Sequence, residues 1–140
     1  MSAPAPARPA PSSTAPQTLL RRVLLLDAAV TGANAVAYLA ASGPLGDLLG
    51  VGDGLLPALG VFLLGYAAAV AALAARPAPP ALGVRLVIDA NVLWVAGSVL
   101  APLLWLDPST AGTVWTAMQA AVVLGFAALQ WTLLRRVLGG

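Results

Sequence analysis

The chain has 140 residues, of which 60% are hydrophobic and only 9% are charged, and its formal net charge is +2. A soluble domain carries roughly 25% charged residues, so this composition excludes a water-soluble globular fold and predicts one membrane domain. The chain contains no Cys and no His, which excludes thiolate chemistry and removes the commonest ligands of metals and haem. We therefore expect no metal site, no cofactor and no enzymatic activity.

The net positive charge comes from Arg residues that lie beside apolar segments. This arrangement favours contact with anionic lipid head groups. A nucleic-acid-binding protein would instead need a basic face with interleaved aromatic residues. The lipid bilayer is thus the expected partner, and nucleic acid is not.

In chain order, residues 1–18 come first and contain five Pro with many Ala and Ser. Such a segment cannot bury enough apolar surface to offset the entropy lost on ordering, so it predicts a disordered tail. Residues 19–136 form the predicted transmembrane domain, and residues 137–140 form a short C-terminal tail.

Four apolar stretches fill this domain, each about as long as a helix that crosses a bilayer. Between the first two lies a Gly-rich, amphipathic stretch at 42–54, which is expected to lie along the membrane surface. Asp53 at its end can cap the next helix, and Pro102 is expected to bend the end of the third span. The expected spans are about 20–41, 55–75, 84–106 and 111–134.

Backbone groups in lipid must be satisfied within each span, so the predicted fold is all-α, a four-helix bundle with up-down-up-down topology. The seven Arg residues lie only in the N-terminal region, around the 76–85 loop and at the C-terminus. Asp47, Asp53 and Asp107 lie in the other connections. The positive-inside rule then predicts a multi-pass protein of the cell membrane with both termini in the cytoplasm. Trp105 and Trp115 are expected at the outer membrane interface.

Polar residues recur on one face of the first span, at spacings of four, three and four residues. The third and fourth spans carry further polar residues in their apolar interiors. These side chains are expected to face the bundle interior or another subunit. They either form hydrogen bonds between helices or line a path for a proton, an ion or a small molecule. The candidates are Asp27, Thr31, Asn34 and Tyr38 in the first span, Asp89 and Asn91 in the third, and Gln119 in the fourth.

Two carboxylates, Asp27 and Asp89, lie inside apolar spans. Each is within about a turn and a half of an Arg, so both are expected near the cytoplasmic boundary of the membrane. We expect them to form structural ion pairs with Arg21, Arg22 or Arg85. A titrating or ion-binding role is the alternative, and Asp27 is the better candidate because it begins the polar stripe of the first span.

The order of features over residues 19–136 resembles that of small, uncharacterised, four-helix bacterial membrane proteins of the DoxX-like kind. The segments that carry the resemblance are the interfacial GPLGDLLGVG, the second-span ALGVFLLGYAAA and the third-span DANVLW. The resemblance implies a four-helix membrane fold and adds no assigned activity.

In size and helix count the chain is also similar to the small multidrug transporters, whose first helix carries a membrane-embedded carboxylate. Asp27 is the residue that matches this feature, although that family uses Glu. The sequence therefore predicts a non-enzymatic membrane bundle, as a homo-oligomer or as a subunit of a membrane complex. The alternative is a small proton- or ion-coupled transporter in which Asp27 is the intramembrane carboxylate.

Overall fold

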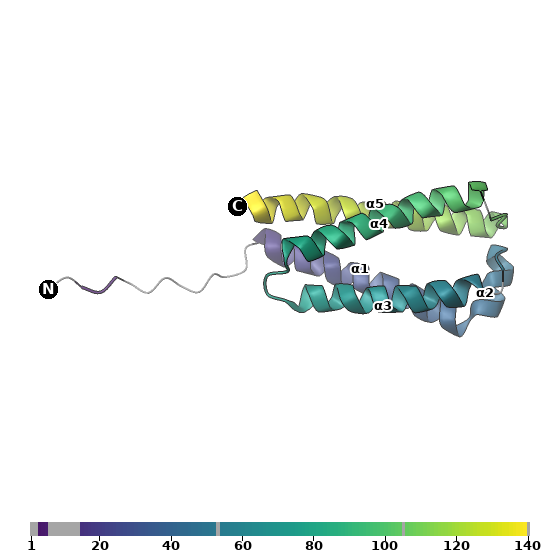
Figure 1. Ribbon diagram of the computed structural model, residues 1–140, viewed down its shortest axis with the longest axis horizontal. Coiled ribbons are helices and arrows are strands. Elements are labelled where there is room, and N and C mark those ends of the chain that lie inside the picture. The colour runs from purple at the N-terminus through teal and green to yellow at the C-terminus, as the bar shows by residue number, and fades with distance from the viewer. Residues whose placement is uncertain (1–2, 6–14, 53, 105, 140) are drawn as a thin grey trace.

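The computed structural model describes residues 3–5, 15–52, 54–104 and 106–139, and within these residues the fold is all-α (Figure 1). Four of its helices are long and apolar enough to cross a membrane. This confirms the predicted class, a polytopic helical membrane protein. The helices are α1 (Ala15–Ala40), α2 (Ser42–Leu49), α3 (Leu55–Ala75), α4 (Ala81–Leu104) and α5 (Thr110–Gly139).

The helices extend further than the sequence predicts at three places. Residues 15–18, expected in the disordered tail, form the first turn of α1, and α4 begins at Ala81 instead of about residue 84. At the other end, residues 137–139 continue α5. Arg is a good helix former, so the Arg pairs beside the apolar stretches do not end the helices. The rest of the expected tail, at 6–14, lies outside the described residues.

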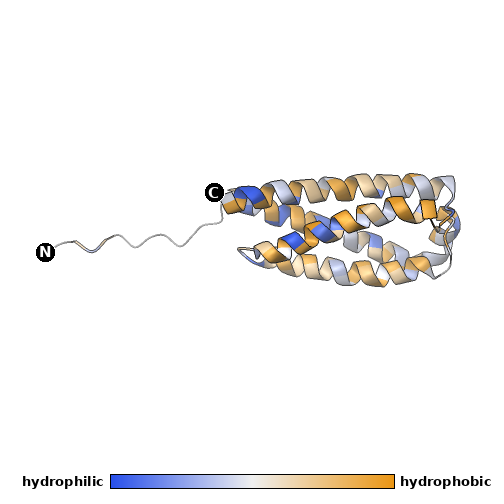
Figure 2. Cartoon of the chain, turned by 45° about the horizontal axis from the view of Figure 1, so that its top comes forward, coloured by the Kyte–Doolittle hydropathy of each residue, from blue (hydrophilic) through white to orange (hydrophobic). Residues whose placement is uncertain are grey.

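The four long helices form an up-and-down bundle in which α1 begins and α5 ends at the same end (Figure 1). The α3–α4 connection lies there too, and the described Arg residues are in the helical turns and the connection near this end. We call it the arginine end. Figure 2 shows hydrophilic residues gathered near the end of α5, with apolar residues along most of the outer helix surfaces. The opposite end carries α2, and we call it the α2 end.

At the α2 end, the short helix α2 is joined to the start of α5. Gly50 ends α2 with a left-handed φ of 70°, and its N–H donates to the carbonyl of Gly46. The Ser109 hydroxyl donates to the Leu48 carbonyl at 2.6 Å and accepts from the N–H of Gly112 at 3.1 Å, so it caps α5. The predicted amphipathic stretch is thus a helix that covers this end. The predicted helix cap at Asp53 and the predicted interfacial position of Trp105 concern residues outside the described ones.

The bundle is packed unevenly along its length. A tight apolar core fills the arginine end, where Leu20 and Leu24 of α1, Val70 of α3, Val84 of α4 and Leu134 of α5 are almost fully buried. Along the bundle, α1 packs against α3 and α5, and α4 packs against α5. By contrast, α4 meets α3 over a short stretch only, so the bundle is looser between these two helices.

Candidate functional site

A buried carboxylate lies at the centre of the bundle. Asp27 of α1 is only 2% exposed. Its Oδ2 accepts hydrogen bonds from the Asn91 amide of α4 at 2.9 Å and from the Gln130 amide of α5 at 2.8 Å. Its Oδ1 accepts from the Thr31 hydroxyl, one helical turn further along α1, at 3.2 Å. Three donors therefore hold the carboxylate in place.

The hydrogen bonds continue from Asp27 into α3, so all four long helices take part. The Asn91 amide also donates to Gln130 Oε1 at 3.0 Å, and the Tyr66 hydroxyl of α3 donates to Asn91 Oδ1 at 3.0 Å. Every buried polar side-chain atom in the described part of the chain has a partner. We call Asp27, Thr31, Tyr66, Asn91 and Gln130 the polar cluster.

The polar cluster satisfies the hydrogen bonds of Asp27 but supplies no positive charge. Its donors are two amides and one hydroxyl, all neutral. Taking an ionised carboxylate out of water costs several kcal/mol unless an opposite charge compensates. The described neighbours of Asp27 thus satisfy its hydrogen bonds without compensating a negative charge.

The Arg residues expected to pair with Asp27 do not contact it. Arg21 donates instead to the backbone carbonyl of Ala74, at the last turn of α3, at 2.9 Å. The side chains of Arg22 and Arg85 are exposed. Among the described residues, Asp27 has amide and hydroxyl partners in place of the expected guanidinium.

Asp27 lies midway along α1. Its partner Asn91 lies near the middle of the 24-residue α4, and Tyr66, which donates to Asn91, lies near the middle of the 21-residue α3. Asp27 is therefore level with the middles of α3 and α4 and lies away from the arginine end of the bundle. The reason is that α1 begins at Ala15, so its Arg residues lie within the helix and do not mark its boundary.

A second, smaller polar group lies nearer the α2 end. The Tyr38 hydroxyl of α1 accepts hydrogen bonds from Trp115 Nε1 at 2.9 Å and from the Gln119 amide at 3.0 Å, both of α5. Tyr38 is buried. The stripe predicted on the first span thus makes two separate contacts with the rest of the bundle, through Asp27 and through Tyr38.

A cavity of about 620 Å³, lined by all four long helices, extends from Asp27 past Tyr38 toward the α2 end. This volume is within the range of roughly 300–1,000 Å³ that small-molecule sites occupy. The polar cluster closes it toward the arginine end, while Leu49 of α2 and Pro108 border it at the α2 end. Its walls are mostly apolar and include six aromatic rings, those of Tyr38, Phe62, Tyr66, Trp94, Trp115 and Phe126.

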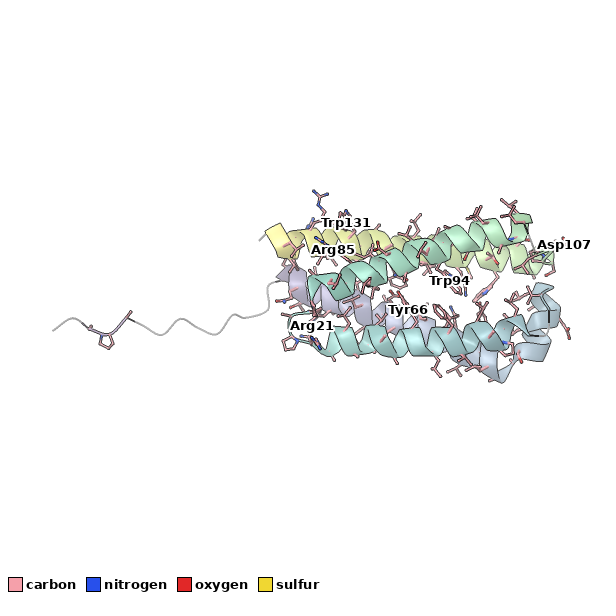
Figure 3. All side chains as sticks on the ribbon, viewed as in Figure 1. Arg21, Tyr66, Arg85, Trp94, Asp107 and Trp131 are labelled. Atoms are coloured by element: carbon pink, nitrogen blue, oxygen red, sulfur yellow. The ribbon has the colours of Figure 1, made fainter. Side chains whose placement is uncertain are left out.

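The cavity opens sideways, between α3 and α4. Phe62 of α3 and Leu93 of α4 both line it, yet they are 59% and 70% exposed on the outer surface of the bundle. In Figure 3 the side chains of Tyr66 and Trp94 point from these two helices into the space between them. In a bilayer this opening would face lipid, because both helices are apolar over their length.

The structure brings most of the predicted residues to one site. Asp27, Thr31, Asn34, Tyr38, Asn91 and Gln119 all line the cavity. Asp89 does not line the cavity, because it lies on the exposed side of α4, away from Asn91. Tyr66 and Gln130 were not among the candidate path residues, although each is a polar side chain in the middle of an apolar span, which is the signal that marks them.

Taken together, the fold and the cavity define a small integral membrane protein with one internal polar site. No group of three or more His, Cys, Asp or Glu among the described residues could hold a metal ion. Comparison with protein-family models, with curated proteins and with solved structures finds no significant match for this chain. The case for a function therefore depends on the geometry of the site.

Proposed function

We propose that this protein is a non-enzymatic membrane carrier that exchanges a small lipophilic cation for a proton at Asp27. The observation that carries the proposal is the position of a buried carboxylate, without a positive partner, at the closed end of a ligand-sized cavity. This is the transporter alternative that the sequence suggested for Asp27, now supported by a cavity beside it.

The proposed exchange follows from the electrostatics of the polar cluster. A charged carboxylate at the centre of a membrane is unfavourable, so Asp27 holds either a proton or the positive group of a ligand. Binding of one displaces the other. The hydrogen bonds from Asn91 and Gln130 keep the carboxylate in one position in both states.

The walls of the cavity indicate the rest of the ligand. Aromatic rings favour cations near their faces and provide a large apolar contact surface. The opening between Phe62 and Leu93 faces lipid, so the ligand is expected to enter from the bilayer. A molecule that partitions into lipid and carries one positive group fits both features.

The proposal includes an orientation in the cell membrane. The arginine end faces the cytoplasm by the positive-inside rule, so both termini are cytoplasmic and the cavity lies in the outer half of the bilayer. The DoxX-like relationship also stays a proposal, supported by the order of the helices and the position of α2.

The proposal is tested by uptake of (1-naphthylmethyl)trimethylammonium, a permanently charged aromatic cation, into proteoliposomes with an acidic interior. We expect wild-type protein to accumulate the cation and Asp27→Asn to abolish accumulation, with equal amounts of protein in the vesicles. Asp47→Asn is the matched control, because Asp47 is an exposed carboxylate of α2 outside the cavity. Equal uptake by wild type and Asp27→Asn would exclude this function.

A second candidate is the non-enzymatic bundle or membrane-complex subunit that the sequence predicts. The observation in its favour is that the hydrogen bonds of the polar cluster join all four long helices, as structural contacts between helices would. In that case Asp27→Asn lowers the amount of protein in the membrane, and wild type transports nothing. The uptake experiment therefore separates the two candidates.

A further inference from the structure

We propose that this protein forms a parallel homodimer through the outward face of α4, with Arg85 of each copy paired to Asp89 of the other. The observation behind this proposal is independent of the cavity. It concerns the two charged residues that α4 carries on its exposed side.

Asp89 is a carboxylate on a surface that would face lipid. It lies eight residues after Ala81, about 12 Å along the helix axis from the start of α4, and its side chain is exposed. In the described part of the chain its carboxylate makes no hydrogen bond or ion pair. A short Asp side chain cannot reach back to the membrane surface over that distance, whereas long Lys and Arg side chains can. A partner is therefore expected to cover it.

The surroundings of Asp89 have the spacing of a helix–helix seam. Exposed residues follow one another at alternating steps of four and three, which is the 3.5-residue period of two helices wound in a left-handed pair. Two of them are charged and the others are apolar or small. They are Arg85, Asp89, Val92, Ala96, Val99 and Leu103.

The charges on this face of α4 favour a second copy of the same chain as the binding partner. Two copies with the same orientation in the membrane are related by a two-fold axis along its normal, so equal positions on α4 meet. Arg85 and Asp89 are then about 6 Å apart along the axis, within the reach of an Arg side chain. Each Arg meets the partner's Asp, and the four charges sum to zero.

The first test is the mass of the wild-type protein in a mild detergent, measured by light scattering. We expect the protein mass to be twice the 14.0 kDa of one chain. The second test is cross-linking in lipid vesicles, for which the chain is well suited because it has no native Cys. A single cysteine at the seam, Ala96→Cys, should give an oxidised dimer.

Val61→Cys is the matched control, because Val61 is 65% exposed on α3 and lies near the α2 end of its helix, as Ala96 does. We expect it to cross-link several-fold less. In the Ala96→Cys background, Asp89→Arg should reduce the dimer several-fold, because four Arg then meet at the seam. Adding Arg85→Asp restores complementary charges and should restore cross-linking.

Four results would each overturn the proposal. They are a monomeric mass for the wild type, equal cross-linking at positions 96 and 61, full cross-linking in Asp89→Arg, and failure of the charge exchange to restore it. The amount of each variant in the vesicles is measured in parallel, and the wild-type mass does not depend on any variant.

Discussion

At the level of single residues, Asp27 is a buried side chain held by three hydrogen bonds. Two amides and one hydroxyl donate to it, and each donor comes from the bundle interior. Hydrogen bonds between membrane helices contribute on average about 0.6 kcal/mol and at most about 1.7 kcal/mol each. The polar cluster therefore contributes to stability as well as forming the candidate site, and the two roles need separate tests.

The stability of the polar cluster is tested by Gln130→Leu. This change removes one donor to Asp27 Oδ2 and the acceptor of one N–H of the Asn91 amide, so that buried N–H loses its hydrogen bond. We expect the free energy of unfolding to fall by about 1–2 kcal/mol, measured by denaturing-detergent titration in mixed micelles. Thr132→Val is the control on the same helix, because the Thr132 hydroxyl is exposed and bonds only to the carbonyl of Ala128. If both variants unfold alike, the cluster does not stabilise the bundle.

The sequence predicts part of the site, and the reason is the regularity of α1. The spacing of Asp27, Thr31, Asn34 and Tyr38 places all four on one face, and all four line the cavity. What the sequence cannot supply is the partner of each residue. The contact of Asp27 with Asn91 joins positions 64 residues apart and depends on how α1 and α4 are aligned along the bundle.

At the scale of helices, the contact of α2 with α5 determines how the α2 end is closed. The backbone N–H of Ser109 donates to the Leu49 carbonyl at 3.1 Å, and a Cβ at Gly112 would overlap the same carbonyl oxygen. The two segments can approach this closely only because residue 112 has no side chain. The Gly residues of 42–54 were predicted to lie in a stretch along the membrane surface. How α2 packs against α5 could be learned only from the structure.

The close approach of α2 to α5 is tested by Gly112→Ala. The added methyl group must push α2 away from α5, so we expect a loss of about 1–3 kcal/mol in the free energy of unfolding. Gly125→Ala is the same chemical change on the same helix, and no atom lies within 4 Å of its new Cβ. Because Ala is the better helix former, that variant should match wild type or gain up to about 1 kcal/mol. Equal losses in the two variants would contradict the tight α2–α5 contact.

The positions of the spans were easier to predict than their ends. Each long helix coincides with an apolar stretch, since length and hydropathy are sufficient to mark a membrane helix. The predicted start of α1, at about residue 20, is too late and the predicted end of α5, at about residue 134, is too early, because the Arg pairs beside the apolar stretches are not helix boundaries. In the structure Arg21 lies within α1 and reaches the last turn of α3, so the boundary depends on a contact between helices.

At the scale of the whole molecule, the bundle has a packed half and a hollow half. The arginine end is filled by a continuous apolar core, and the cavity occupies the half toward α2. The polar cluster lies between the two halves. This division leaves one described opening for a ligand, the lateral one between α3 and α4, which the sequence could not predict because it depends on how far these helices separate.

The lateral opening is tested by Gly97→Phe. Gly97 lines the cavity on α4, and no atom lies within 4 Å of its Cβ position, so a ring fits there without displacing the helices. We expect cation binding to weaken at least several-fold while stability is unchanged, measured by equilibrium dialysis of (1-naphthylmethyl)trimethylammonium. Gly125→Phe is the control, because its Cβ position is equally open but lies outside the cavity. Wild-type affinity in Gly97→Phe would place the ligand elsewhere.

The exchange of a cation for a proton at Asp27 is the central claim of this account, and the pH dependence of binding tests it most directly. Affinity of the purified protein for (1-naphthylmethyl)trimethylammonium is measured as the pH is lowered from mildly alkaline to mildly acidic. Because a proton and the cation compete for one carboxylate, wild-type affinity should fall steadily as the pH falls. Binding by Asp27→Asn should be weak at every pH, while Asp47→Asn should follow the wild type. Wild-type binding that does not change with pH, or equal binding by Asp27→Asn, would contradict the account.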